Sequence, residues 1–191
     1  MTEWESDELS WLSEEAQRLV RFACTRMVHS YKPVLMGIFL DELPNLRLPM
    51  RVVAQRFADY YRERWEAGLP VERRGCRFCD NHTLDREICL IVPYHIVRDV
   101  FLVNGWATVA AGEVWLIPPR VWQELAAPSA QLAVRRALRR ALSSFFERIE
   151  LQGEAVYGRT KRHAEADAHG LVSFMSDPDD AGDLFVLPGD H

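Results

Sequence analysis

The chain has 191 residues, 48% of them hydrophobic, with four cysteines and a formal net charge of −5. This length and composition predict one medium domain or two small ones, with enough apolar surface for a core that needs no disulfides. No apolar run approaches the roughly 20 residues of a membrane span and the acidic N-terminus lacks a signal-peptide pattern, so we expect a cytoplasmic protein without membrane association, whose cysteines are reduced thiols or metal ligands.

The charge is unevenly distributed along the chain. Residues 1–15 carry six acids and residues 163–191 carry seven, and neither segment contains Lys or Arg. All 23 basic residues therefore lie between positions 16 and 162, where they outnumber the acids by eight. A basic body attracts phosphate backbones, and acidic ends can compete for the same surface. The alternative is that the acidic termini only keep the chain soluble.

The segment from Glu8 to His29 is predicted to form the first helix. Its apolar residues recur along one side, and Ser10 or Ser13 can cap it ahead of the first-turn acids Glu14 and Glu15.

Two further helices are predicted within the segment from Ser30 to Arg74. Apolar residues recur at helical spacing over positions 34–43 and again over 50–65. Pro44 ends the first of these helices, and Gly68 ends the second. Such a pair is the usual start of a helix-turn-helix or winged-helix unit.

The helical period is lost after this pair. Val71–Asp85 is predicted to be a connecting loop, and 87–92 a short strand that leads into a helix near Pro93. Trp106–Val109 and Glu113–Ile117 are predicted to form a hairpin. A helix followed by a hairpin is the pattern of a wing.

The remaining elements lie in the last third of the chain. Arg120–Leu125 is predicted to form a short helical turn, and 128–151 a long helix with a clear 3.6-residue period. Beyond Gly153 the sequence is irregular, apart from two apolar islands at 171–175 and 184–187 that could dock as peptides.

Together these elements predict a mainly α (α+β) fold: a winged-helix-like helical domain with a short β-hairpin wing and a long C-terminal helix. We divide the chain into an N-terminal helix-turn-helix-like half (1–75), a linker with a candidate metal knuckle (76–90), a winged second half (91–152) and an irregular acidic tail (153–191).

The spacing of several apolar and aromatic residues carries a family resemblance. The segments concerned are Ser30–Leu35, Arg56–Tyr61, Ile91–Tyr94, Trp122 with Leu125, and Phe145–Phe146. Over roughly residues 30 to 150 the chain resembles the winged-helix-like module that accompanies HNH nuclease or helicase domains in bacterial restriction and phage-defence proteins. The resemblance implies recognition of DNA or of a protein partner, with catalysis done elsewhere. The chain departs from this pattern because no nuclease or helicase domain is attached.

Four residues form a candidate metal site. Cys76 and Cys79 have the spacing of a zinc knuckle, and His82 and Cys89 could complete a tetrahedral set around a structural zinc ion. The alternative is that these cysteines are reduced and unliganded, because Cys89 lies among apolar residues.

Eleven arginines are candidates for contact with DNA or RNA, because the guanidinium group binds two phosphate oxygens at once. They are Arg47, Arg51, Arg56 and Arg62 around the second helix of the pair, Arg73, Arg74 and Arg77 in the loop, and Arg135, Arg136, Arg139 and Arg140 on the last long helix. The alternative is a surface of ion pairs, because Asp59, Glu63 and Glu66 interleave with the second-helix arginines.

The motifs of common enzyme sites are absent from the sequence: a glycine-rich phosphate loop, a nucleophile elbow, a zincin motif and a dinucleotide fingerprint. We therefore predict a non-enzymatic winged-helix module that binds nucleic acid or regulates a nucleic-acid-directed bacterial defence system. A protein-interaction adaptor that docks through its acidic termini is the alternative, and a zinc-dependent nuclease is a third.

Overall fold

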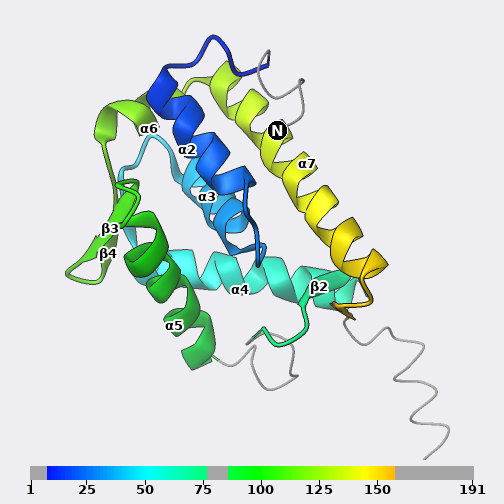
Figure 1. Cartoon of the computed structure of the whole chain (residues 1–191). Coiled ribbons are helices and arrows are strands. Elements are labelled where there is room, and N and C mark those ends of the chain that lie inside the picture. The colour runs from blue at the N-terminus through cyan, green and yellow to red at the C-terminus, as the bar shows by residue number, and fades with distance from the viewer. Residues whose placement is uncertain (1–7, 77–85, 158–191) are drawn as a thin grey trace, which may run out of the picture. The chain divides into compact units, whose positions relative to one another are not determined.

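The computed structural model of the protein describes residues 8–76 and 86–157, excluding the side chains of residues 86–90. It is mainly helical with two small antiparallel sheets, which confirms the predicted α (α+β) class (Figure 1). The elements in chain order are α2 (Glu14–Cys24), α3 (Tyr31–Glu42), β1 (Arg47–Pro49), α4 (Met50–Glu66), β2 (Pro70–Arg73), α5 (Arg86–Ile96), the π-helical turn η1 (Val97–Phe101), β3 (Ala107–Ala110), β4 (Glu113–Leu116), α6 (Pro119–Leu125), α7 (Pro128–Leu151) and β5 (Ala155–Tyr157).

The first helix is shorter than predicted. Ser13 caps α2 by accepting a hydrogen bond from the Ala16 backbone N–H at 3.2 Å, as expected. The helix ends at Cys24, because Thr25 takes an extended backbone and Arg26 has a positive φ of 49°. The predicted continuation to His29 is therefore wrong.

The predicted hairpin is present as β3 and β4, with Val109 opposite Val114. Ala111 and Gly112 at its tip have positive φ values of 51° and 77°, the backbone of a tight two-residue hairpin turn. The strand β1, which was not predicted, pairs with β4 and places Leu48 opposite Val114. The resulting strand order is β1-β4-β3.

The predicted strand at 87–92 is instead part of α5. A short apolar run does not by itself distinguish a strand from a buried helical segment. Here Val92 and Val97 are both buried in the core, which fits a helix that continues into η1. The π-helical turn is marked by the Leu102 N–H, which donates to the Val97 carbonyl at 2.9 Å.

A second small sheet replaces part of the predicted loop and part of the predicted irregular tail. Pro70–Arg73 forms β2, which pairs antiparallel with β5 at Ala155–Tyr157. The two strands are only four and three residues long, so neither has enough length to show an alternating pattern. The rest of the predicted tail, 158–191, lies outside the described residues, as do both apolar islands.

The core is shared by residues from both sides of the 76–90 segment. The ring of Phe39 in α3 contacts those of Phe101 in η1 and Trp122 in α6, with centroids 5.4 and 5.8 Å apart. All three side chains are fully buried. In Figure 1, α2 and α3 lie beside α7 while α4 crosses below them. Because α4 crosses the other helices in this way, the strip between α4 and α7 is part of the protein surface.

Candidate functional site

Most of the arginines predicted to bind nucleic acid are engaged within the chain. Arg56 lies 2.5 Å from Glu42, and Arg135 lies 2.6 Å from Asp41. The guanidinium of Arg47 stacks 3.9 Å from the ring centre of Trp115. In addition, Arg62 pairs with Asp59, Arg73 with Glu154, and Arg140 with Glu8. Five of these side chains are therefore in ion pairs, and among the acids that interleave with the second-helix arginines it is Asp59 that pairs, with Arg62.

The side chains of four of the predicted arginines have no hydrogen-bond or ion-pair partner among the described residues. They are Arg51 at the start of α4, Arg74 after β2, and Arg136 and Arg139 on α7. They come from three separate elements, which gives no single basic ridge. Arg77 lies outside the described residues.

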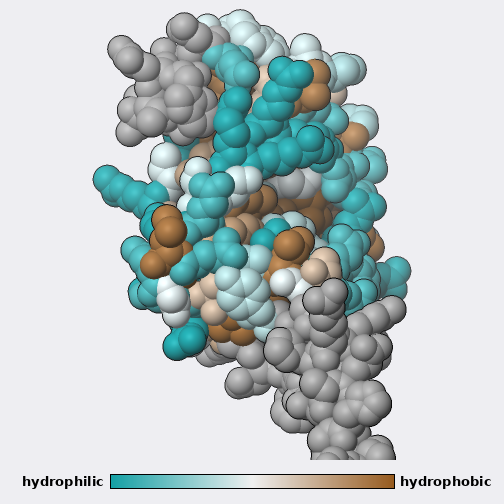
Figure 2. Space-filling model, turned by 90° about the vertical axis from the view of Figure 1, so that its right-hand side faces the viewer, coloured by the Kyte–Doolittle hydropathy of each residue, from teal (hydrophilic) through white to brown (hydrophobic). Residues whose placement is uncertain are grey.

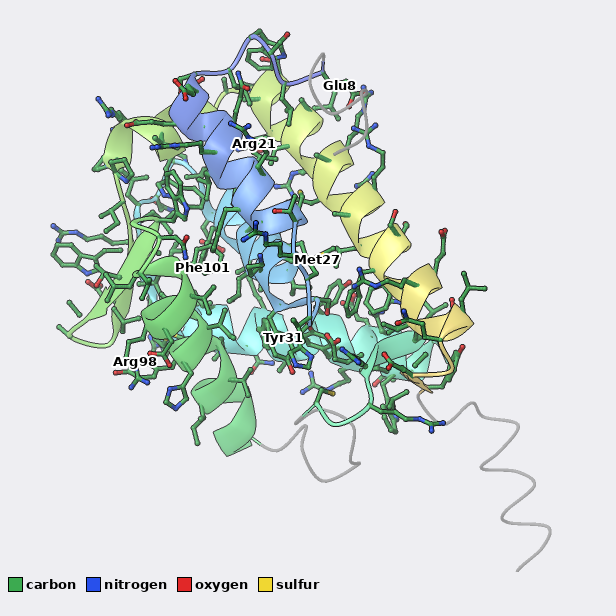
Figure 3. All side chains as sticks on the ribbon, in the orientation of Figure 1. Glu8, Arg21, Met27, Tyr31, Arg98 and Phe101 are labelled. Carbon is green, nitrogen blue, oxygen red and sulfur yellow. The ribbon has the colours of Figure 1, made fainter. Side chains whose placement is uncertain are left out.

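One acidic residue near the N-terminus lies on the basic helix α7 (Figure 3). Glu8 pairs with Arg140, whose hydrogen bond lowers the pKa of the Glu8 carboxyl. In the same region Glu15 lies 2.5 Å from Arg120. These contacts are of the kind expected if acidic ends compete for basic surface.

Of the candidate zinc ligands, only Cys76 has a described side chain. It is disulfide-bonded, contrary to the expected reduced thiol or metal ligand, and its partner lies outside the described side chains. Cysteines close enough to share a zinc ion are also close enough to form a disulfide, so their spacing in the sequence does not distinguish the two. Cys79 and His82 lie outside the described residues, as does the side chain of Cys89, and the described residues contain no group of three or more His, Cys, Asp or Glu that could hold a metal ion.

A groove runs between α4 and α7. It consists of two adjoining pockets of about 420 and 560 Å³, which share Tyr60, Arg139 and Leu142. Along α7 the lining extends from Arg135 to Glu150, which corresponds to about 22 Å of helix. Figure 2, which views the molecule from the α7 side, shows hydrophobic residues enclosed by hydrophilic ones.

The floor of the groove is apolar and is opened by a glycine. Ile38 and Leu138 contribute buried side chains, and Phe146 lies at the other end. Gly37 lies in the interior of α3, where a Cβ would meet nothing within 4 Å. A helix-interior glycine costs about 1 kcal/mol relative to alanine. No neighbouring atom would clash with a larger side chain at position 37. The glycine therefore leaves open space in the groove beside the α3 backbone.

The rims of the groove carry charges of both signs that have no partner among the described residues. Arg139 and Glu147 lie eight positions apart on α7, which is about two helical turns. Glu63 lies on the α4 side. A ligand with only one sign of charge would leave part of this rim unmatched.

A buried polar cluster, which the sequence pattern did not indicate, fixes the position of β2 beside the start of α3. Glu72 is fully buried and accepts hydrogen bonds from the Ser30 backbone N–H at 2.9 Å and from the Ser30 hydroxyl at 2.5 Å. The Ser30 hydroxyl also lies 2.7 Å from the Tyr61 hydroxyl. His29 Nδ1 is 3.5 Å from Glu72. Glu72, Ser30 and Tyr61 are closed to solvent, whereas the His29 side chain is 33% exposed at the edge of the cluster, so we assign the cluster to stability.

Comparison of the chain with protein-family models, curated proteins and solved structures gives no match. Within the described part of the chain, no helix is both long and apolar enough to span a bilayer.

Proposed function

We propose that this chain is a non-enzymatic, winged-helix-type interaction module that binds a helix of a partner protein in the groove between α4 and α7. The groove carries the proposal, because a groove about 22 Å long with an apolar floor is the shape that an amphipathic helix fills with its i, i+3, i+4 and i+7 side chains. The strand order β1-β4-β3, reached through the intervening helices, supports the winged-helix type.

The charges on the rim define the chemistry of the partner helix. Its flank beside α7 should carry an acidic residue opposite Arg139 and a basic residue about two turns away, opposite Glu147. Its apolar stripe should place a bulky side chain over Gly37. The groove is a different docking site from the acidic termini that the sequence favoured for an adaptor.

Selection from a phage-displayed library of amphipathic helical peptides tests this proposal. Peptides enriched on the full chain should carry opposite charges about two turns apart, and binding should weaken at least about tenfold to the Gly37→Leu variant, which fills the floor. Arg139→Glu should weaken binding, whereas the matched control Arg136→Glu should not, because Arg136 lies on the same helix outside the groove. Enriched peptides that bind Gly37→Leu as well as the native chain would refute the groove as their site.

Nucleic-acid binding is the second candidate function. It is favoured by the strand order and by four arginines whose side chains have no hydrogen-bond or ion-pair partner among the described residues, Arg51, Arg74, Arg136 and Arg139. A fluorescence titration of labelled duplex DNA at several salt concentrations tests it, because each phosphate contact contributes about −0.9 to the slope of log K against log salt. A steep slope that falls on Arg136→Gln or Arg139→Gln would support this function. Absence of binding at low salt would exclude it.

A further inference from the structure

The outer face of α5 and η1 exposes more apolar surface than a solvated helix requires. Ile91, Tyr94, Leu102 and Val103 are 42%, 38%, 41% and 79% exposed. They recur at intervals of three, eight and one along the helix and the turn after it. Large apolar side chains that recur on one face of a helix mark an interaction site more often than single exposed ones do.

Arg98 and Asp99 lie in the middle of this face. The Arg98 Nε donates to the Asp99 carboxylate at 2.6 Å, and its guanidinium lies 5.7 Å from the ring centre of Tyr94. In Figure 3, Arg98 is on the outer side of the helix, whereas Phe101 points toward the core, where its ring meets Phe22 at 5.1 Å. The face is therefore continuous from Tyr94 through Arg98.

The order of these residues is self-complementary. Apolar residues stand on both sides of a central polar group, which consists of Arg98, Asp99 and His95, whose Nδ1 lies 3.5 Å from the Asp99 carboxylate. If two copies of the face run antiparallel about a two-fold axis between positions 98 and 99, Arg98 of each copy lies opposite Asp99 of the other. The same axis places Tyr94 opposite Val103 and His95 opposite Leu102. Two-fold interfaces require this kind of self-matching surface.

The π-helical turn contributes to this pairing of residues between the two copies. In η1 the hydrogen bond from Leu102 to Val97 spans five residues instead of four. The wider turn advances the exposed stripe by one residue, so Val103 follows Arg98 on the outer side of the chain. π turns of this kind occur often at functional sites.

We infer that the face formed by Tyr94, Arg98, Asp99, Leu102 and Val103 is a homodimer interface, in which it pairs antiparallel with the same face of a second copy. A face with one positive and one negative charge offers no net attraction to a phosphate backbone. The inference does not depend on the proposed function, because none of these residues lines the groove between α4 and α7.

Sedimentation velocity on the full chain tests the dimer over about a hundredfold range of concentration. The native chain should approach twice its monomer mass of 22.1 kDa. Val103→Glu should weaken self-association at least about tenfold. Leu132→Glu is the matched control, because Leu132 is 54% exposed on α7 and away from this face. A native chain that stays monomeric, or a Val103→Glu variant that dimerises like the native chain, overturns the inference.

A charge exchange between two variants gives a second test. A helix that is folded but does not form the interface would not give the expected result. Arg98→Asp leaves only acids at positions 98 and 99 and Asp99→Arg leaves only bases, so each variant alone should dimerise at least about tenfold more weakly than the native chain. Mixed together, the two variants should form a heterodimer, because each base then faces an acid of the other copy. Circular dichroism spectra that match the native chain would show that both variants are folded. Failure of the mixture to associate overturns the antiparallel pairing.

Discussion

The carboxylate of Glu72 is a single buried charge on which three backbone or hydroxyl donors converge. Besides the two donors of Ser30, the backbone N–H of Arg73 lies 2.9 Å from Glu72 Oε1. Removal of a buried acceptor leaves its donors without a partner, which costs more than the hydrogen bonds themselves contribute. We therefore expect Glu72→Ala to lower the free energy of unfolding by about 3 kcal/mol, measured by urea denaturation.

The matched control for this substitution is Glu63→Ala. Glu63 is exposed and has no partner among the described residues, so its replacement should change the free energy of unfolding by less than about 0.5 kcal/mol. Equal denaturation midpoints for Glu72→Ala and the native chain would contradict the structural role of the cluster.

Tyr61 makes the same cluster sensitive to high pH. Burial, reinforced by the negative charge of Glu72, raises the pKa of the Tyr61 hydroxyl well above 10.0. Below about pH 10 both folded and unfolded chains keep this proton, but above it the unfolded chain loses the proton first, so stability falls as the pH rises. The free energy of unfolding of Tyr61→Phe should therefore decline less between about pH 9 and 11 than that of the native chain. Parallel declines in urea titrations at both pH values would refute this.

This cluster also shows what the sequence could not reveal at the residue scale. Ser30 and Glu72 are 42 positions apart, and neither belongs to a motif. A buried acid is recognised only when its donors are known, and those donors come from a loop and a strand that local periodicity does not predict. The Ser13 cap, by contrast, was predictable because its acceptor and donor are three residues apart.

At the scale of single elements, Gly37 has two separate effects: it lowers the stability of α3, and it shapes the groove. Because a Cβ at this position meets nothing within 4 Å, Gly37→Ala should increase the free energy of unfolding by about 0.8 kcal/mol, as expected for a helix interior. Thermal or urea unfolding measures the change. Gly112→Ala is the contrasting control, since Gly112 has a φ of +77° and alanine there should destabilise the hairpin. A loss of stability in Gly37→Ala would mean that the glycine serves packing instead.

The predictability of the elements followed their length. The segments α3, α4 and α7 contain 12, 17 and 24 residues, and their apolar periods were sufficient to predict them. The strands β1, β2 and β5 contain three or four residues and depend on partners far away in the chain. Residues 87–92, in the first part of α5, were predicted as a strand because their apolar run is too short to show a period. The groove could not be predicted, because it arises from the packing of three helices.

At the scale of the whole molecule, the two surfaces proposed here lie on different elements. The groove is formed by α3, α4 and α7 with residues beside β2, whereas the dimer face belongs to α5 and η1. A dimer of this kind would present two grooves and so could hold two partner helices at once. Such bivalency raises the apparent affinity for a partner that is itself dimeric.

The end of α7 is joined to the middle of the chain by β5, and the strength of this join can be measured. Arg73 and Glu154 are 81 positions apart, with Arg73 Nε 2.7 Å from Glu154 Oε2, and the Arg74 N–H donates to the Glu154 carbonyl at 2.7 Å. Both side chains are partly exposed, at 41% and 33%, so solvent screens the pair. A double-mutant cycle of Arg73→Ala and Glu154→Ala should give a coupling energy of about 0.5–1 kcal/mol in low salt and less in about 1 M salt. A coupling energy of zero in low salt would mean that the strand pairing alone holds β5 on β2, since the backbone hydrogen bonds survive both substitutions.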